Sequence, residues 1–418
     1  MKTIAIIGGG ITGVTTAYAL AKRGFDVTLF ERHRYAAMET SFANGGQLSA
    51  SNAEVWTHWS TILKGLKWML KSDAPLLVNP APTWHKLSWF AEFIASIPDY
   101  ERNTIETARM AVAARQHLFA WAAEEGIDFD HKREGILHIY RDKKGFDHAG
   151  KVSELLAKGG LPRRAVTPSE MKAIEPTLAG TYYGGYFTES DSTGDIHKFT
   201  NGLAAAAARL GVRTLYGQDV TTVQSNGTQA VITVAQEEAA PSVHTFDGVV
   251  VCAGVASRDF AAQLGDRVNI YPVKGYSITV NLNDAASQAS APNVSLLDDE
   301  TKLVTSRLGV DRFRVAGTAE FNGVNRDIRA DRIRPLIDWV EQCFPNINTR
   351  SVVPWAGLRP MMPNMMPRVG KGRAANVFYN TGHGHLGWTL SAVTADMLGH
   401  VVSDAARGVQ LPGTFQAA

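Results

Sequence analysis

A glycine-rich turn near the start of the chain constrains the fold more than any other feature. The apolar run Thr3–Ile7 leads into the sequence GGGITG at residues 8–13, and residues 12–23 continue as a helix with an apolar face. The spacing G-x-G-x-x-G between a strand and a helix is typical of dinucleotide binding, because the turn is tight and a pyrophosphate must approach the backbone closely. The N–H groups and the dipole at the start of the helix attract phosphate. This pattern predicts a βαβ unit that binds a dinucleotide.

A second strand supports that prediction. Val27–Glu31 completes a unit of about 30 residues, the length of a mononucleotide-binding half. Glu31 ends this strand at the place where a carboxylate accepts hydrogen bonds from ribose hydroxyls. A turn that binds nothing is the simpler alternative, and the glycine pattern alone does not separate NAD from FAD.

Later segments extend the unit into a doubly wound sheet. The helical stretch Ile196–Leu210 precedes a strand at Val212–Tyr216, and Phe246–Cys252 is a run rich in β-branched residues. A strand at Val377–Asn380 and a helix from about Trp388 are expected to close this domain.

Other regions have a different pattern of apolar and polar residues. Val268–Val280 and Phe313–Val315 alternate as strands do, and Glu101–Glu125 is helical in pattern. We therefore expect an α/β protein, α+β overall, in which a Rossmann-like domain carries an inserted substrate domain of mixed β-sheet and helices. The expected ranges are 1–85, 150–225 and 346–418 for the cofactor domain, and 86–149 and 226–345 for the substrate domain.

Composition excludes several classes of function. The net charge of +2 gives no electrostatic footprint for nucleic acid. Cys252 and Cys343 are too few for a disulfide framework, so a reducing, cytoplasmic location is expected, and the first residues lack the shape of a signal peptide. The longest charge-free run, Ala374–Ala395, is broken by Asn, His and Gly, so no membrane span is expected. No metal site is expected either.

Four further segments resemble D-amino-acid dehydrogenases of the small-subunit type. They lie at residues 40–49, 271–277, 355–360 and 380–388 and together span nearly the whole chain. On these segments the chain is identified as a member of the D-amino-acid oxidase-like family of FAD-dependent oxidoreductases. The resemblance implies FAD stretched across the first domain, with its ring facing a pocket walled by the second.

The resemblance also implies which residues contact FAD. They belong to the glycine turn, the end of the second strand, the loop after residue 40, the adenine side and the C-terminal glycine loop: Gly8, Gly10, Ile11, Thr12, Gly13, Glu31, Arg32, Ser41, Asn44, Gly45, Gln47, Leu48, Val220, Ala253, Gly254, Gly357, Gly382, Gly384, Leu386, Gly387, Trp388 and Thr389. The C-terminal loop precedes a helix, so its N–H groups and dipole suit the negative charge of a reduced flavin.

Four residues are candidates for the catalytic pocket. The guanidinium fork of Arg359 matches a carboxylate in two hydrogen bonds, and a structural salt bridge is its alternative role. Tyr271 and Tyr276 could offer pocket hydroxyls or belong to the core. His385 stands where the family usually has Thr and could meet a ring hydroxyl, or bond to the backbone as an ordinary loop histidine.

The implied reaction is oxidative deamination of a D-amino acid. The Cα hydrogen leaves as hydride to flavin N5, and water hydrolyses the imino acid to a 2-oxo acid and ammonia. The implied partners are a small amino acid and a quinone or other respiratory acceptor. Five tryptophans and several lysines (Lys64, Lys67, Lys71 and Lys86) between Trp56 and Trp89 could rest peripherally on the inner membrane, or form core or an active-site lid.

Other functions stay open. The substrate could be cis-4-hydroxy-D-proline. The protein could instead be a glycine- or sarcosine-type oxidase that releases hydrogen peroxide, because such an enzyme shares the cofactor residues. It could also be an FAD-binding subunit of a larger dehydrogenase. A nicotinamide-dependent dehydrogenase would explain the glycine turn but leave the C-terminal glycine loop without a purpose.

Overall fold

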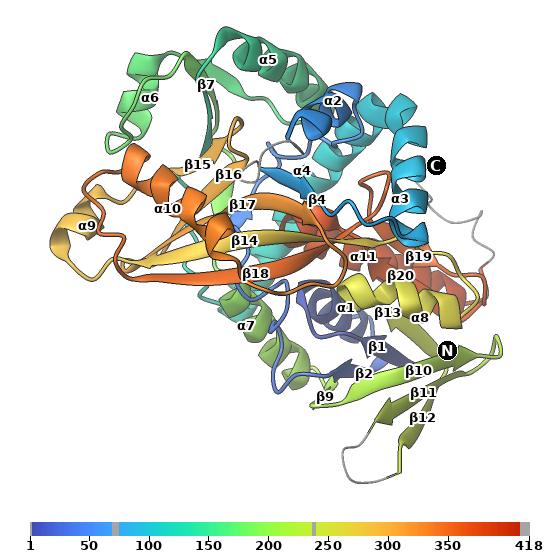
Figure 1. Ribbon diagram of the computed structural model, residues 1–418. Helices are drawn as coiled ribbons and strands as arrows, with labels where there is room; N and C mark the ends of the chain where they lie inside the picture. Colours follow the sequence, from blue (N-terminus) through green and yellow to red (C-terminus); the bar gives the residue numbers. More distant parts are fainter. Residues whose placement is uncertain (1, 69–74, 236–239, 410–418) are drawn as a thin grey trace.

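The computed structural model describes residues 2–68, 75–235 and 240–409, which form two large β-sheets surrounded by helices (Figure 1). The first sheet has six strands in the order β19-β20-β13-β1-β2-β9, and its neighbours are parallel except for β19 and β20. Its strands are β1 (Thr3–Ile7), β2 (Asp26–Glu31), β9 (Arg213–Tyr216), β13 (Gly248–Val251), β19 (Arg368–Lys371) and β20 (Val377–Thr381).

Both faces of this sheet are buried, which explains the unbroken apolar run of β1. Ile4 and Ile6 pack against helices on one face, while Ala5 and Ile7 pack against a small three-stranded sheet on the other. The covering elements are α1 (Ile11–Ala21), α7 (Ile196–Arg209), α11 (Gly387–Ala406), β10 (Asp219–Ser225), β11 (Ala230–Ala235) and β12 (Ser242–Phe246). The predicted β1-α1-β2 unit is therefore present.

The second sheet has nine strands and is largely antiparallel. Eight follow the order β18-β14-β17-β16-β15-β5-β7-β6, and β4 also pairs with β17. Their bounds are β4 (Leu76–Val78), β5 (Ile136–Tyr140), β6 (Arg164–Val166), β7 (Gly184–Thr188), β14 (Tyr271–Asn281), β15 (Ser295–Asp298), β16 (Leu303–Leu308), β17 (Arg312–Phe321) and β18 (Val352–Met361). Helix α10 (Ala330–Cys343) packs on one face through Leu336 and Trp339.

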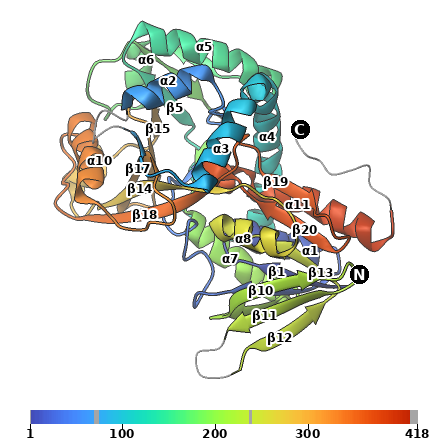
Figure 2. The ribbon, with the colours of Figure 1, turned by 45° about the vertical axis from the view of Figure 1, so that its right-hand side comes forward.

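Helices join the two sheets into one body, as the turned view shows (Figure 2). The 26-residue helix α4 (Tyr100–Glu125) packs against both α11 and α5 (Lys143–Lys158). The remaining helices of eight residues or more are α2 (Trp59–Trp68) and α3 (Trp84–Ala95). Shorter elements are β3 (Gln47–Leu48), β8 (Ser192–Thr193), α6 (Pro168–Ile174), α8 (Ser257–Gln263), α9 (Ala285–Ser290), η1 (Ile97–Asp99), η2 (Gly254–Ala256) and η3 (Gly384–Leu386). Within the described ranges, no helix is both long enough and apolar enough to cross a membrane.

The sheets divide the chain differently from the expected ranges. Strand β13 falls in the expected substrate range 226–345 but pairs with β1, whereas β18 falls in the cofactor range 346–418 but pairs with β14. Strands β6 and β7 likewise join the second sheet. The chain crosses between the sheets several times, because a strand joins the edge that its hydrogen bonds and side chains fit, regardless of its neighbours in sequence. A two-domain division that follows the sheets remains a proposal.

Candidate active site

A cavity of about 700 Å³ lies between the first sheet and strands of the second. Its floor is built by the residues that follow β1, β2, β13 and β20, which is where ligands bind in open parallel sheets. Its walls come from the loop at residues 39–52 and from strands β14, β16, β17 and β18. All the sequence-predicted site residues line this cavity except Gly13, Leu48 and Tyr271.

The glycine turn is packed so tightly that side chains do not fit. A Cβ atom on Gly13 would overlap the carbonyl oxygen of Gly8, and Gly8 itself has a positive φ of 108°. The N-cap residue Gly10 has no side chain to cap the first turn of α1. Free N–H groups at a helix start attract anions, so this turn suits a pyrophosphate. Gly13 thus contributes close packing and not a cavity surface.

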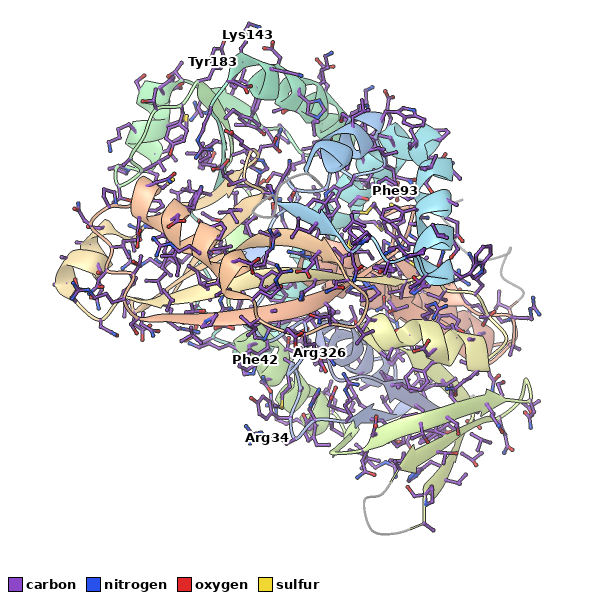
Figure 3. All side chains as sticks on the ribbon, viewed as in Figure 1. Arg34, Phe42, Phe93, Lys143, Tyr183 and Arg326 are labelled. Atoms are coloured by element: carbon purple, nitrogen blue, oxygen red, sulfur yellow. The ribbon has the colours of Figure 1, made fainter. Side chains whose placement is uncertain are left out.

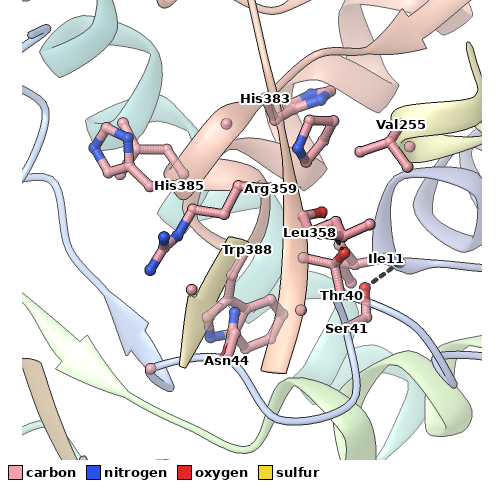
Figure 4. A pocket seen from close by; sticks show the side chains of 18 of the residues that line it. Ile11, Thr40, Ser41, Asn44, Val255, Leu358, Arg359, His383, His385 and Trp388 are labelled. Atoms are coloured by element: carbon pink, nitrogen blue, oxygen red, sulfur yellow. Dashed lines mark hydrogen bonds between the residues drawn. The ribbon is translucent and has the colours of Figure 1, made fainter. Parts of the chain in front are cut away.

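Glu31 holds the glycine turn in place. Its Oε2 accepts a hydrogen bond from the Gly9 N–H at 2.6 Å, and its Oε1 accepts one from the His33 N–H at 2.8 Å. Ser41 fixes the other side of the turn, because its Oγ accepts the Ile11 N–H at 3.0 Å (Figure 4). The turn is therefore preorganised by side chains that are far away in sequence.

Charged residues close one side of the cavity. Arg32 pairs with Glu39, which also pairs with Arg326 at 3.0 Å. Arg326 belongs to the loop between β17 and α10 and lies at the edge of the second sheet that faces the first (Figure 3). Although burial opposes ionisation of Glu39, a hydrogen bond from His33 and the two arginine charges hold its pKa below the ordinary value. This ion-pair cluster connects the floor of the cavity with the second sheet.

The loop after residue 40 is fastened to the second sheet. Ser277 donates to the Ala43 carbonyl at 2.9 Å, and Ser306 donates to the Gly45 carbonyl at 2.6 Å. A Cβ atom on Gly45 would lie 2.6 Å from Val304, so only glycine allows this approach. The loop therefore forms a thin polar wall suited to backbone contact with a planar ligand.

Arg359 is a buried cation that faces the cavity. Its Nη1 donates to the Thr318 carbonyl at 2.8 Å, and no other hydrogen bond or ion pair involves its side chain among the described residues. Burial lowers its pKa to about 10, so the group stays charged at neutral pH. The remaining guanidinium N–H groups are available to a carboxylate.

Two backbone features make room for Arg359. A Cβ atom on Gly275 would overlap the guanidinium, so the glycine leaves the space that the side chain fills. Thr318 has a φ of 58°, which is unusual for a β-branched residue, at a register shift between β14 and β17. This bulge directs the Thr318 carbonyl at Arg359, which is consistent with strain held at a functional position.

His385 lies beside Arg359 (Figure 4). Its Nε2 is 3.2 Å from the Asn52 carbonyl, and its ring stacks on Trp56 with centroids 4.9 Å apart. Because a carbonyl only accepts, Nε2 carries the proton. Burial, with a smaller effect of the Arg359 charge, lowers the pKa to about 4. The imidazole is therefore neutral at physiological pH. Its hydrogen bond to the backbone is the second of the two roles that the sequence left open for this residue.

The two tyrosines are engaged within the protein. Tyr276 donates to Glu320 at 2.8 Å, and Glu320 also lies 3.5 Å from the buried amine of Lys274. The Tyr271 hydroxyl accepts the Gly323 N–H at 3.2 Å, and its ring packs among core aromatics away from the cavity. Tyr276 lines the cavity but its hydroxyl proton is donated to Glu320, and Tyr271 does not line the cavity.

Sequence reasoning missed several cavity residues. Glu54, His138 and Thr318 line the cavity but belong to no motif. Nothing in the local sequence marks them, because they meet only after the two sheets pack together. Leu48, which was expected at the flavin, lies in the core behind the cavity wall. In the part of the chain that the structure describes, no three His, Cys, Asp or Glu side chains gather as metal ligands.

Comparison with known proteins agrees with this geometry. Residues 3–401 match the family described as FAD dependent oxidoreductase. The chain belongs to this family. A protein from Mesorhizobium japonicum named "D-amino acid dehydrogenase 3" is 64% identical over 96% of this chain and 97% of its own length. One from Dechloromonas aromatica named "D-amino acid dehydrogenase" is 40% identical over 96% of each.

The fold is also found among solved structures. The glycine oxidase of Geobacillus kaustophilus aligns with a TM-score of 0.75 over 100% of this chain and 98% of its own, at 19% identity. Members of this family use FAD, and the cofactor of this chain is FAD. The glycine cradle, the start of α1, whose N-cap residue Gly10 has no side chain, and the polar loop after residue 40 fit such a cofactor. The predicted fold class and cofactor are confirmed.

Proposed function

We propose that this chain oxidises the Cα–N bond of a D-amino acid and passes the electrons to an acceptor other than oxygen. The single observation that carries the proposal is Arg359, a buried cation without an acidic partner among the described residues, in a cavity of a flavin oxidoreductase. An amino acid supplies the missing carboxylate. The two relatives named as D-amino acid dehydrogenases support the choice of substrate and acceptor class.

FAD would extend along the floor of the cavity. The start of α1 would hold the pyrophosphate, and Glu31 would face the ribose. Ala253, Gly254 and Val220 would border the adenine, and the loop at residues 382–389 would surround the pyrimidine end of the flavin. The buried Nε1 of Trp388, which has no protein partner among the described residues, fits a ligand acceptor in this place.

The chain's own residues would orient the substrate and keep its amine neutral. Bound FAD supplies the acceptor for the hydride that leaves Cα. Arg359 would bind the carboxylate in two hydrogen bonds and so fix the height of Cα. Leu297, Val304 and Ala316 contribute apolar surface to the cavity wall, which disfavours an ammonium group. The imino acid product then reacts with water to give the 2-oxo acid and ammonia.

The purified protein should be tested under nitrogen with D- and L-amino acids, glycine, sarcosine and hydroxyprolines. We expect D-amino acids to bleach the visible flavin absorbance and L-amino acids to leave it, with slow recovery in air. Immediate recovery of the absorbance in air, or bleaching by glycine and sarcosine alone, would show that the protein is an oxidase and not a dehydrogenase. A flavin that no substrate reduces would instead indicate an FAD-binding subunit.

We also propose that the protein docks on the inner membrane through α2 and α3 and reduces a quinone there. Trp59 and Leu63 of α2 are 58% and 66% exposed, and they lie four residues apart on one helical face. Trp84 and Leu87 of α3 are 84% and 51% exposed, three residues apart. Such exposed apolar faces are typical of interfacial helices.

Several of the tryptophans and lysines between Trp56 and Trp89 do not belong to this proposed surface. Trp89 is core, and Trp56 packs on His385. Lys86 is buried and donates to the carbonyls of Asn79 and Ala81, so it cannot face a membrane. Lys71 lies outside the described residues, and the side chains of Lys64 and Lys67 are also outside them. The proposed surface therefore rests on apolar side chains.

Liposome co-sedimentation tests this surface. Trp84→Ser combined with Leu87→Ser should lower the bound fraction at least about tenfold, because each side chain contributes about 2 kcal/mol when it leaves water. Val243→Ser, at an exposed apolar residue of the distant strand β12, is the matched control and should bind as the wild type does. A wild-type protein that does not sediment with liposomes would end the proposal.

A further inference from the structure

One part of the cavity is polar and has no role in the flavin chemistry described above. Its lining residues come from the loop after β3, from β5 and α5, from the residue before β6, and from the turn between β15 and β16: Asn52, Glu54, His138, Tyr140, His148, Arg163, Asp299 and Lys302. Buried polar groups are costly unless they are paired, so a polar chamber of this kind requires an explanation.

Glu54 is the acidic group of this chamber that is incompletely paired. Its Oε1 accepts a hydrogen bond from the Tyr100 hydroxyl at 2.7 Å and lies 3.5 Å from Nε2 of His148. No partner for Oε2 occurs among the described residues. Although burial opposes ionisation, the bonds from His148 and Tyr100 hold the pKa of Glu54 below the ordinary value. The side chain is therefore a carboxylate with one free oxygen.

The position of Glu54 relates it to the substrate anchor. Asn52, Glu54 and Trp56 are alternate residues of one segment, and all three line the cavity. His385 contacts both ends of the segment, through the Asn52 carbonyl and the Trp56 ring, and it lies beside Arg359. Glu54 and Arg359 line the same cavity, and no hydrogen bond or ion pair joins them among the described residues. The cavity that both residues line, about 700 Å³ in volume, has room for a substrate.

We propose that the free oxygen of Glu54 accepts a hydrogen bond from a donor group on the substrate side chain, a hydroxyl or an ammonium, while Arg359 holds the carboxylate. This inference rests on the proposed function and adds the substrate class to it. Tyr100 and His148 are positioning residues that occupy one oxygen and leave the other for the ligand. A site built around a polar substrate group rejects the analogue that lacks it, because the bound analogue covers the half-buried carboxylate and leaves it unpaired.

Matched substrate pairs test the inference by the ratio of kcat/KM within each pair. cis-4-Hydroxy-D-proline is compared with D-proline, and D-lysine with D-norleucine. The wild type should favour the donor-bearing member of one pair by about tenfold or more. Glu54→Leu should bring that ratio to within about threefold of unity. Glu54→Gln should remove an ammonium preference but retain much of a hydroxyl preference, because the amide oxygen still accepts.

Glu101→Gln, on the exposed start of α4 beside Tyr100, is the matched control and should keep the wild-type ratio. Flavin absorbance of each variant reports folding, and Glu54→Gln keeps the test available if Glu54→Leu does not fold. Equal rates within both pairs for the wild type, or a ratio unchanged in Glu54→Leu, would overturn the inference while D-amino acids still reduce the flavin. A flavin that no D-amino acid reduces would overturn the proposed function as well.

Discussion

Replacing Arg359 with methionine should raise the KM for a D-amino acid roughly 100-fold, because truncating a buried partner of a charged pair costs about 3 kcal/mol. The guanidinium has one bond, to the Thr318 carbonyl, and its other N–H groups face the cavity. The flavin should remain bound, since the side chain supports no residue of the glycine cradle. Anaerobic flavin reduction over a range of substrate concentrations measures the effect.

Two comparisons isolate the role of the fork. Arg359→Lys keeps the charge but not the paired geometry, so it should recover only part of the affinity. Arg350→Met removes an exposed arginine and should behave as the wild type. If Arg359→Met retained the wild-type KM, the carboxylate would bind elsewhere, and Arg359 would be a structural residue.

Gly13→Ala should leave most of the purified protein without FAD and lower the free energy of unfolding by about 3 kcal/mol. The new Cβ would overlap the Gly8 carbonyl, which is backbone and cannot rotate away. Moving Gly8 would also disturb Gly9, whose N–H donates to Glu31. The ratio of flavin to protein absorbance and the thermal midpoint report the two effects.

A glycine in an ordinary helix provides the control. Gly145 lies in α5, and a Cβ there would meet only side-chain atoms at 3.3 Å or more. Gly145→Ala should therefore keep the flavin and the thermal midpoint. Full flavin content in Gly13→Ala would mean that the turn adjusts more easily than its packing indicates.

The partners and the protonation state of His385 could not be predicted from the sequence. The sequence places this residue in the C-terminal glycine loop and leaves it either a ligand contact or a backbone-bonded histidine. The structure gives it a carbonyl partner, Asn52, and a stacked ring, Trp56, from more than 300 residues away along the chain. Its pKa follows from burial, which no local pattern reveals.

Tyr271 and Tyr276 show the same limit on a strand that the sequence predicts correctly. Alternation along Val268–Val280 predicts a strand, and β14 confirms it. Alternation also predicts which side chains share a face. Whether a hydroxyl on that face meets a substrate depends on the neighbouring strand, and here β17 supplies Glu320 to Tyr276.

The sequence by itself determined the cofactor half of this protein. Its signals are local: a strand, a glycine turn and a helix follow one another within about 30 residues, and only glycine fits their backbone contacts. The substrate half was decided by tertiary structure. The partners of Arg359 and Glu54 come from strands and helices far apart in the chain, and the packing of two sheets alone sets which charges are buried, paired or left free for a ligand.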